Sequence, residues 1–152
     1  MAGLKMLSRR ELSEAQIRQR LARREYQPAE VDTAIARLKE NRSLDDARVA
    51  GAIARTETGI RKRGRLRVRR QIEAAGISPA LAQRTVDELF DTLDADALLE
   101  AALQKRLRGR ARIEDQREYA RLFRYLLVQG FESDRIRQAL GRLKPEARGW
   151  TG

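Results

Sequence analysis

The sequence predicts an all-α protein: three tandem three-helix repeats that form an elongated, curved helical array with no sheet. Strong helix formers (Ala, Leu, Arg, Glu and Gln) dominate, and no segment alternates β-branched and polar residues. Residues 17–38, 68–89 and 122–143 also align with one another at offsets of 51 and 54 residues. Each copy reads as a helix, a glycine-type turn, one apolar residue, a cap and a second helix.

One further helix is expected before the second copy and another before the third, so that each module contains three short helices. The first module is shortened at its N-terminus. Repeats of this size bury small cores and contact mainly their neighbours. The expected divisions are 1–42 for the first module, 43–93 for the second, 94–145 for the third, and 146–152 for a flexible tail.

The helix starts of the first two modules carry capping signals. Ser13 and Gln16 have the spacing of a capping box, in which a hydroxyl and an amide side chain satisfy free backbone N–H groups. Ser43 and Asp46 have the same spacing and predict a second box before a helix over about 45–60. Pro28 is expected as the first residue of a helix, where a missing N–H has no cost.

Glycine, proline and aspartate mark the later boundaries. Gly76 and Gly130 each follow a helical pattern and are expected to end it in a left-handed conformation. Pro79 begins a helix, Asp94 caps one over about 96–107, and Pro145 ends the last. Two aromatic residues, Tyr26 and Phe131, follow their turns at equivalent positions, where a packing role is expected.

The charge indicates a polyanionic or acidic partner. Lys and Arg number 33 against 22 Asp and Glu, a net charge of +11. The densest run spans residues 61–70 and contains no acid. With a helix starting near Arg65, Arg65 and Arg69 share an outward face while Val68 and Ile72 pack inward. This run is predicted to carry more binding energy than any comparable stretch.

A second basic run spans residues 105–112, and further arginines lie in the first module. The candidate binding residues, for a protein or nucleic-acid partner, are Arg9, Arg10, Arg23, Arg24, Arg61, Lys62, Arg63, Arg65, Arg67, Arg69, Arg70, Lys105, Arg106 and Arg108.

The sequence gives little support for a catalytic function. The sequence contains no histidine and no cysteine, which excludes imidazole bases and thiolate nucleophiles. It has no G-x-x-x-x-G-K-[ST] phosphate loop. Asp45 and Asp46 resemble a metal pair, but adjacent side chains on a helix diverge by about 100°, and helix capping explains them better. We therefore expect no enzyme activity, no catalytic residue, no cofactor and no metal.

The location expected is cytoplasmic, without membrane contact. Residues 1–10 lack the apolar core of a signal peptide, and no stretch approaches the ~20 apolar residues of a membrane span. We expect a monomer.

Four motifs, in order, resemble the RecX family of bacterial regulators of the RecA recombinase. The first runs from Ser13 to Leu21, the second from Leu44 to Ala50, the third from Lys62 through Ile72 to Ile77, and the last from Leu126 to Phe131. The resemblance covers 5–143. Two residues depart from the family pattern: Glu25 replaces a glycine, and Val49 replaces an aromatic residue.

This resemblance implies an inhibitory binding protein. RecX-like proteins lodge in the helical groove of the RecA–single-stranded-DNA filament and suppress ATP hydrolysis, strand exchange, co-protease activity and filament growth. The implied partners are RecA and that filament, and the basic face contacts either RecA or DNA phosphates. Charge alone is equally compatible with a general nucleic-acid-binding protein, and a scaffold that binds only protein is a third possibility.

Overall fold

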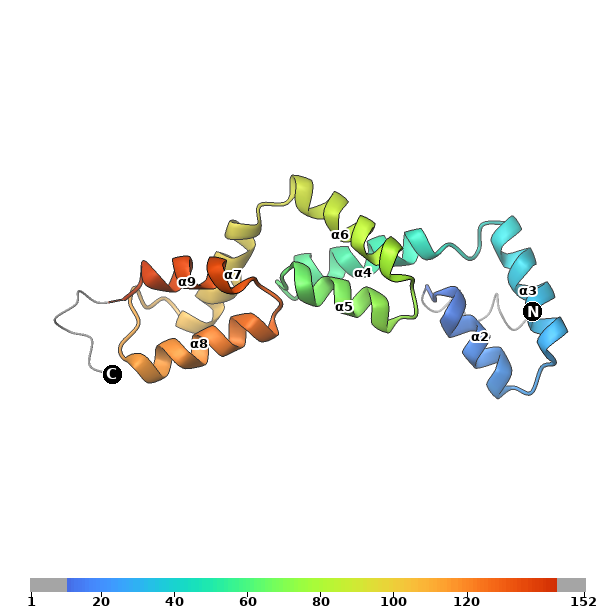
Figure 1. Cartoon of the computed structure of the whole chain (residues 1–152), viewed down its shortest axis with the longest axis horizontal. Helices are drawn as coiled ribbons and strands as arrows, with labels where there is room; N and C mark the ends of the chain where they lie inside the picture. The colour runs from blue at the N-terminus through green and yellow to red at the C-terminus, as the bar shows by residue number, and fades with distance from the viewer. Residues whose placement is uncertain (1–10, 145–152) are drawn as a thin grey trace.

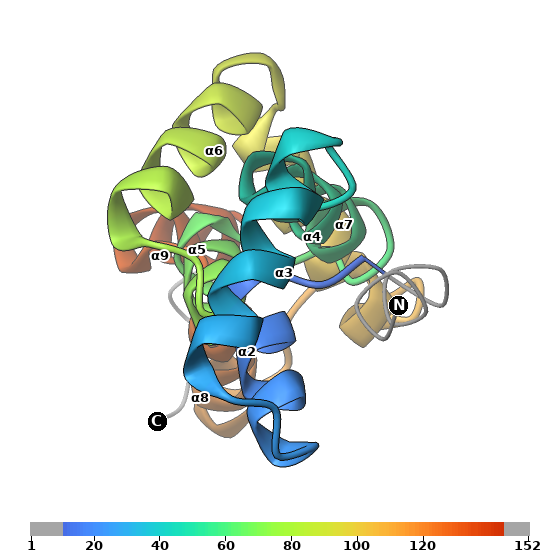
Figure 2. The same cartoon turned by 90° about the vertical axis from the view of Figure 1, so that its right-hand side faces the viewer.

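The computed structural model describes residues 11–144, which form eight α-helices and no strand (Figure 1). The helices are α2 (Glu14–Arg23), α3 (Pro28–Glu40), α4 (Asp46–Gly59), α5 (Arg65–Ala74), α6 (Pro79–Thr92), α7 (Ala95–Leu107), α8 (Gln116–Val128) and α9 (Ser133–Gly141). They follow one another along an elongated body, so the predicted all-α repeat array is confirmed. Seen along its length, the modules lie one behind another (Figure 2).

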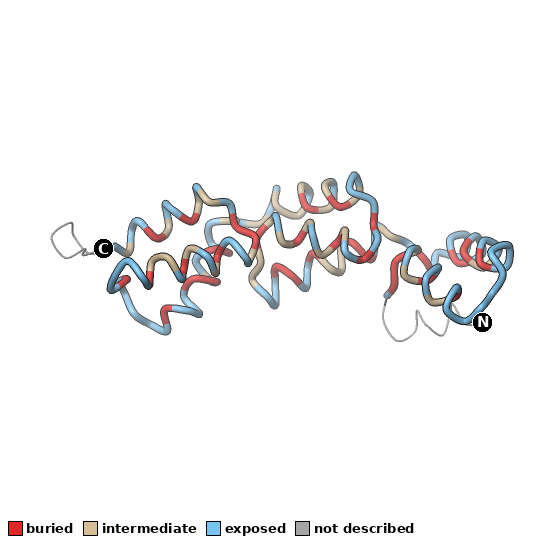
Figure 3. Tube along the Cα trace, turned by 60° about the horizontal axis from the view of Figure 1, so that its bottom comes forward, coloured by how far each residue is buried: buried red, intermediate tan, exposed pale blue. Residues whose placement is uncertain are grey.

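Helix packing is concentrated within modules. Helices α2 and α3 pack together in the first module, α4 to α6 in the second, and α7 to α9 in the third. Each module has its own buried apolar cluster, and these clusters are spaced along the array (Figure 3). Phe90 packs against both the second and the third cluster. The protein is therefore stabilised as a row of small cores with narrow connections between them.

Most predicted helix starts are confirmed. Ser13 and Gln16 form the capping box of α2. Helices α3 and α6 begin at Pro28 and Pro79, and Asp94 caps α7 by accepting from two backbone N–H groups. Local polar side chains, placed where orphan N–H groups need acceptors, thus fix these boundaries.

The second predicted capping box, from Ser43 to Asp46, is wrong. Asp45 is the N-cap of α4, and its carboxylate accepts from the N–H groups of Ala47 and Arg48. The reason lies one residue earlier. Leu44 is buried in the first module's core and its N–H donates to Leu38, which keeps the chain non-helical until Asp45.

Three equivalent turns follow the middle helices α2, α5 and α8. Gly76 and Gly130 have φ angles of +82° and +100°, which confirms the left-handed caps. Glu25, at the equivalent place after α2, has a φ of 64°. In the first and third turns the following N–H, of Tyr26 or Phe131, donates to the carbonyl five residues earlier in the chain, Leu21 or Leu126, and closes the helix.

The aromatic residues after these turns differ. Phe131 is buried in the third core, as predicted, whereas Tyr26 is exposed, so its predicted packing role is wrong. No described module precedes the first turn to cover Tyr26. Arg9, Arg10, Pro145 and the predicted tail at 146–152 lie outside the described residues.

The modules join head to tail through the middle helices. The hydroxyl of Ser13, the N-cap of α2, donates to the carbonyl of Ala75 at the end of α5. The N–H of Gly64, the N-cap of α5, donates to the carbonyl of Gln129 at the end of α8, at 2.8 Å. A free donor at one helix start thus meets a free carbonyl at the next helix end, which also aligns the helix dipoles favourably.

Candidate functional site

The basic run 61–70 lies where the second module meets the third. Four hydrogen bonds join residues 60–67 to residues 127–130, and we call these two segments the seam. The backbone N–H groups of Gly64 and Leu66 donate to Gln129 and Gly130, at 2.8 and 3.1 Å. The guanidinium of Arg67 donates to the carbonyl of Val128 at 3.0 Å, and the Gln129 side chain donates to the Arg61 carbonyl at 3.3 Å.

A buried carboxylate organises the loop before α5. Glu57, on the last turn of α4, is almost fully buried and pairs with two arginines. Arg61 lies 3.4 Å from one of its oxygens and Arg63 lies 2.8 Å from the other. A buried charge is costly unless it is paired. Arg61 and Arg63 therefore neutralise Glu57, and their charge is not free to bind a ligand.

The arginines of α5 are also engaged. Arg65 donates to Asp87 of α6 at 2.6 Å and lies 5.4 Å from the centre of the Phe90 ring. This hydrogen bond, together with one from Gln83, holds the pKa of Asp87 below its ordinary value. Arg69 pairs with Glu73 one turn further along the helix.

The run 61–70 contains no acid, but in the fold its arginines pair with three acids from outside the run, Glu57, Glu73 and Asp87. Five of its seven basic side chains have a partner, and four of these five pair with an acid from α4, α5 or α6. In the described part of the chain, Lys62 and Arg70 alone of this run have no hydrogen bond or ion pair. The Glu57–Arg61 and Arg69–Glu73 pairs were visible as four-residue spacings, whereas Asp87 carried no sequence signal.

One arginine of the second basic run covers an aromatic ring. Arg106 lies over the ring of Tyr125, 4.0 Å from its centre. Arg110 donates to buried Glu118 at 2.9 Å, which raises the pKa of Arg110 above its ordinary value. Lys105 and Arg108 are exposed at the end of α7. Tyr125 thus packs against the third core on one side and under an arginine on the other.

The structure brings the two basic runs together. Gln129 donates to the Arg61 carbonyl and also to the Tyr125 hydroxyl, both at 3.3 Å, and Arg106 covers that same ring. Sequence reasoning missed two exposed cations of α8 beside this link, Arg121 and Arg124. Their three-residue spacing on one helix face was the available signal. Arg23 and Arg24 are exposed at the far end of α2 and do not join this group.

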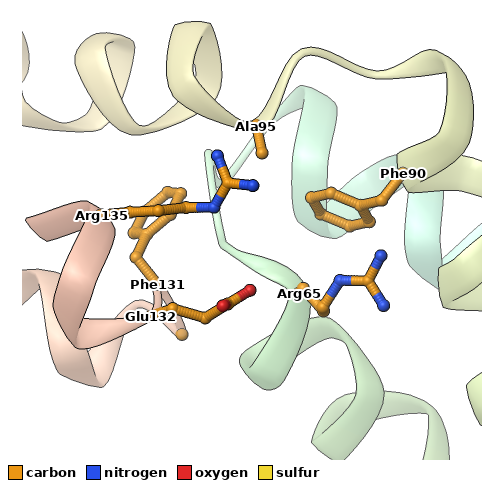
Figure 4. Close-up of a pocket in the computed structure, with 7 residues that line it drawn as sticks. Arg65, Phe90, Ala95, Phe131, Glu132 and Arg135 are labelled. Carbon is orange, nitrogen blue, oxygen red and sulfur yellow. The ribbon is translucent and has the colours of Figure 1, made fainter.

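A small pocket of about 60 Å³ lies between α5, α6 and the start of α9 (Figure 4). Phe90 and Phe131 line it from the two modules, and Arg65 and Arg135 flank it. Both arginines already have carboxylate partners, since Arg135 donates to Asp96 at 2.7 Å. The pocket marks the place where the second and third modules meet with incomplete packing.

The described residues contain no group of three or more acidic side chains arranged to hold a metal ion. Asp45 caps α4, and Asp46 accepts the N–H of Glu14 at 2.8 Å, which ties the start of α2 to the second module. The described helices are all too short or too polar to cross a membrane.

Comparison with known proteins gives a consistent result. Residues 2–38 match the model of the first three-helix domain of RecX, and residues 94–140 match that of the third. The Regulatory protein RecX of Halorhodospira halophila is 31% identical over 139 residues, covering 91% of this chain and 83% of the relative. That of Vibrio parahaemolyticus is 29% identical over 139 residues, covering 91% and 87%.

Solved structures agree on the fold. The crystal structure of RecX from Lactobacillus salivarius matches 93% of this chain and 92% of its own, with a TM-score of 0.73 and 19% identity. A second crystal structure of a regulatory protein RecX gives the same TM-score at 18% identity, covering 91% of this chain and 67% of its own.

Proposed function

Because the chain belongs to the RecX family of regulatory proteins, we propose that it binds RecA and the RecA–single-stranded-DNA filament and inhibits them. It lies in the helical groove of the filament and suppresses ATP hydrolysis, strand exchange, co-protease activity and filament growth. Family membership is the observation that carries this proposal.

The architecture supports a groove-binding role. Modules joined end to end present several contact surfaces along one elongated body. Weak sites held on one chain reinforce one another, because the first contact raises the effective concentration of the next. A filament offers repeated subunits that such a row of modules can contact in succession. The divisions near residues 43 and 94 are proposed as the limits of these contact units.

The contact residues belong to the predicted basic set. Lys62 and Arg70 come first, since no partner within the described residues competes for them, and Lys105, Arg106 and Arg108 extend the same region. Arg63 and Arg65 contribute indirectly by holding Glu57 and Asp87. The protein acts in the cytoplasm as a monomer and needs no cofactor.

A RecA ATPase assay on single-stranded DNA tests the function. We expect near-stoichiometric amounts of the protein to lower the rate, and the protein alone to hydrolyse no ATP. An unchanged rate at large excess would overturn the regulatory role. Magnesium-dependent hydrolysis by the purified chain would overturn its assignment as a non-enzyme.

A pull-down from nuclease-treated lysate separates this function from general nucleic-acid binding. Retention of RecA after nuclease treatment is expected for a protein–protein interface. Complete loss of RecA would instead support a basic helical protein that contacts only phosphates.

The basic surface is tested with paired charge variants. Lys62→Gln with Arg70→Gln removes the two unpartnered cations of the run, and Arg23→Gln with Arg24→Gln removes two exposed cations far from the seam. We expect the first variant to weaken filament binding more than the second. Where phosphate is the ligand, each lost contact also flattens the log–log salt dependence by about one unit. Equal affinities for both variants would contradict this placement.

A further inference from the structure

We propose that the seam is a protein-docking surface that accepts apolar side chains flanked by carboxylates, and that it is the part of the chain that contacts the RecA protein rather than the DNA. This inference rests on the proposed function, since RecA is the partner named there.

Exposed apolar side chains concentrate at the seam. Five large hydrophobic residues are notably exposed in the described part of the chain, and four of them lie in the seam segments. These four are Ile60 (71% exposed), Val128 (59%), Leu66 (46%) and Leu127 (40%). A single exposed aliphatic residue is ordinary, but several gathered at one place on a highly charged protein mark an interaction surface.

The backbone of the seam is already satisfied, so these side chains are not exposed for lack of local structure. Leu66 and Val128 belong to the ends of α5 and α8, whose backbones are joined by the hydrogen bonds described above. The two modules therefore hold the apolar side chains on a firm support. A preorganised surface loses less entropy when it binds a partner.

Unpaired positive charge surrounds this apolar group. The acids next to the run 61–70, Glu57, Glu73 and Asp87, are each paired with an arginine. Four further cations have no hydrogen bond or ion pair within the described residues: Lys62, Arg70, Arg121 and Arg124. An apolar centre with a cationic rim is complementary to a protein surface on which carboxylates border apolar groups.

Aliphatic side chains distinguish a protein partner from a nucleic acid. Proteins that bind single strands without sequence preference stack bases on aromatic rings and track the backbone with cations. The exposed seam residues are all aliphatic; of the aromatic rings beside them, Phe131 is buried and Tyr125 is covered by Arg106. Burial of aliphatic groups adds little to phosphate binding but much to contact with apolar side chains.

The experiment measures the binding of the full chain to DNA-free RecA and, separately, to a single-stranded oligonucleotide. The test variant combines Leu66→Ser with Val128→Ser. Tyr26→Ser is the control, since it removes an exposed hydrophobic residue far from the seam. Circular dichroism verifies that each variant keeps its helical content, and Leu127→Ser serves as a second seam variant should the double one unfold.

We expect the double variant to bind RecA roughly tenfold or more weakly, while its affinity for the oligonucleotide and that of the control for RecA stay unchanged. A folded seam variant with wild-type affinity for RecA would overturn the docking surface but leave the proposed function intact. Parallel losses for RecA and oligonucleotide would also overturn it. Failure of the wild-type chain to bind RecA at all would overturn the proposed function and this inference with it.

Discussion

The two junctions between modules each join the start of one middle helix to the end of the next, but they use different chemical groups. At the first, the hydroxyl of Ser13 reaches the last carbonyl of α5; at the second, the backbone N–H of Gly64 reaches the last carbonyl of α8. Side chains mediate the first contact, whereas backbone meets backbone in the second. A side chain can adjust its rotamer when a neighbour grows, but two backbones in contact cannot.

The glycines show the same difference. A Cβ built on Gly130 would lie 2.3 Å from the backbone nitrogen of Arg67, and one built on Gly64 would lie 2.7 Å from the Gly130 carbonyl. A Cβ on Gly76 would meet the Ala15 methyl group at 2.4 Å. The second junction therefore has the stricter requirement for glycine, and it is also the junction that carries the seam.

The largest effect is expected for Gly130→Ala. The added methyl group clashes with the backbone of Arg67, and the positive φ is unfavourable for alanine, so the variant should lose at least about 3 kcal/mol of stability. Denaturant unfolding measures the loss. Gly109→Ala is the matched control, because Gly109 has a similar φ of +84° with nothing within 4 Å of its Cβ.

Gly109→Ala should lower the free energy of unfolding by only about 1–2 kcal/mol, which is the strain of an alanine in a left-handed conformation. Equal losses at positions 109 and 130 would mean that the close approach at the second junction contributes nothing.

A smaller loss, about 2–3 kcal/mol, is expected for Gly76→Ala, because the new Cβ would lie within 3 Å of one atom, the Ala15 methyl carbon, whereas one on Gly130 would meet three atoms of Arg67. Ala15→Gly removes that methyl group and should partly restore the stability of Gly76→Ala. A double-mutant cycle should therefore give a favourable coupling of about 1 kcal/mol. Additive losses would show that the first junction opens without cost.

The ion pair beside the second junction predicts a pH dependence. The hydrogen bond from Arg65 lowers the pKa of Asp87, so this pair stabilises the fold above the ordinary aspartate pKa. The contribution decreases as the pH falls through the lowered pKa of the folded state. NMR titration should find the pKa of Asp87 below the ordinary aspartate value, and Arg65→Gln should raise it toward that value. An unshifted Asp87 would contradict the pairing.

The sequence predicted the helices well because their boundaries depend on local chemistry. Ser13, Pro79 and Asp94 act within a turn of their own positions, and the repeat offsets place Gly76 and Gly130. The failure at Ser43 has a tertiary cause: burial of Leu44 outweighs a favourable capping pattern.

The candidate site was less predictable. Charge counting located the basic run but not Asp87, whose pairing with Arg65 depends on how α6 packs on α5. The exposed aliphatic residues of the seam were missed although a signal existed: Leu66 and Val128 each lie two residues, about 200° around the helix, from buried Val68 and Leu126. Periodicity within one helix indicates that such residues face outward, but it does not show that those of α5 and α8 meet at one junction.

The smallest effect is expected at the third equivalent turn, and it has the opposite sign. Glu25 occupies the position of Gly76 and Gly130 with a φ of 64°, and no described module docks against it. Glu25→Gly relieves about 1–2 kcal/mol of left-handed backbone strain but increases the entropy of the unfolded chain by the equivalent of about 0.4–1 kcal/mol. A net gain of between about 0 and 1.6 kcal/mol in the free energy of unfolding is therefore expected in denaturant unfolding. Destabilisation by this substitution would show that the Glu25 side chain makes a stabilising contact. It would also show that the close approach of a neighbouring module is not the whole reason for glycine at positions 76 and 130.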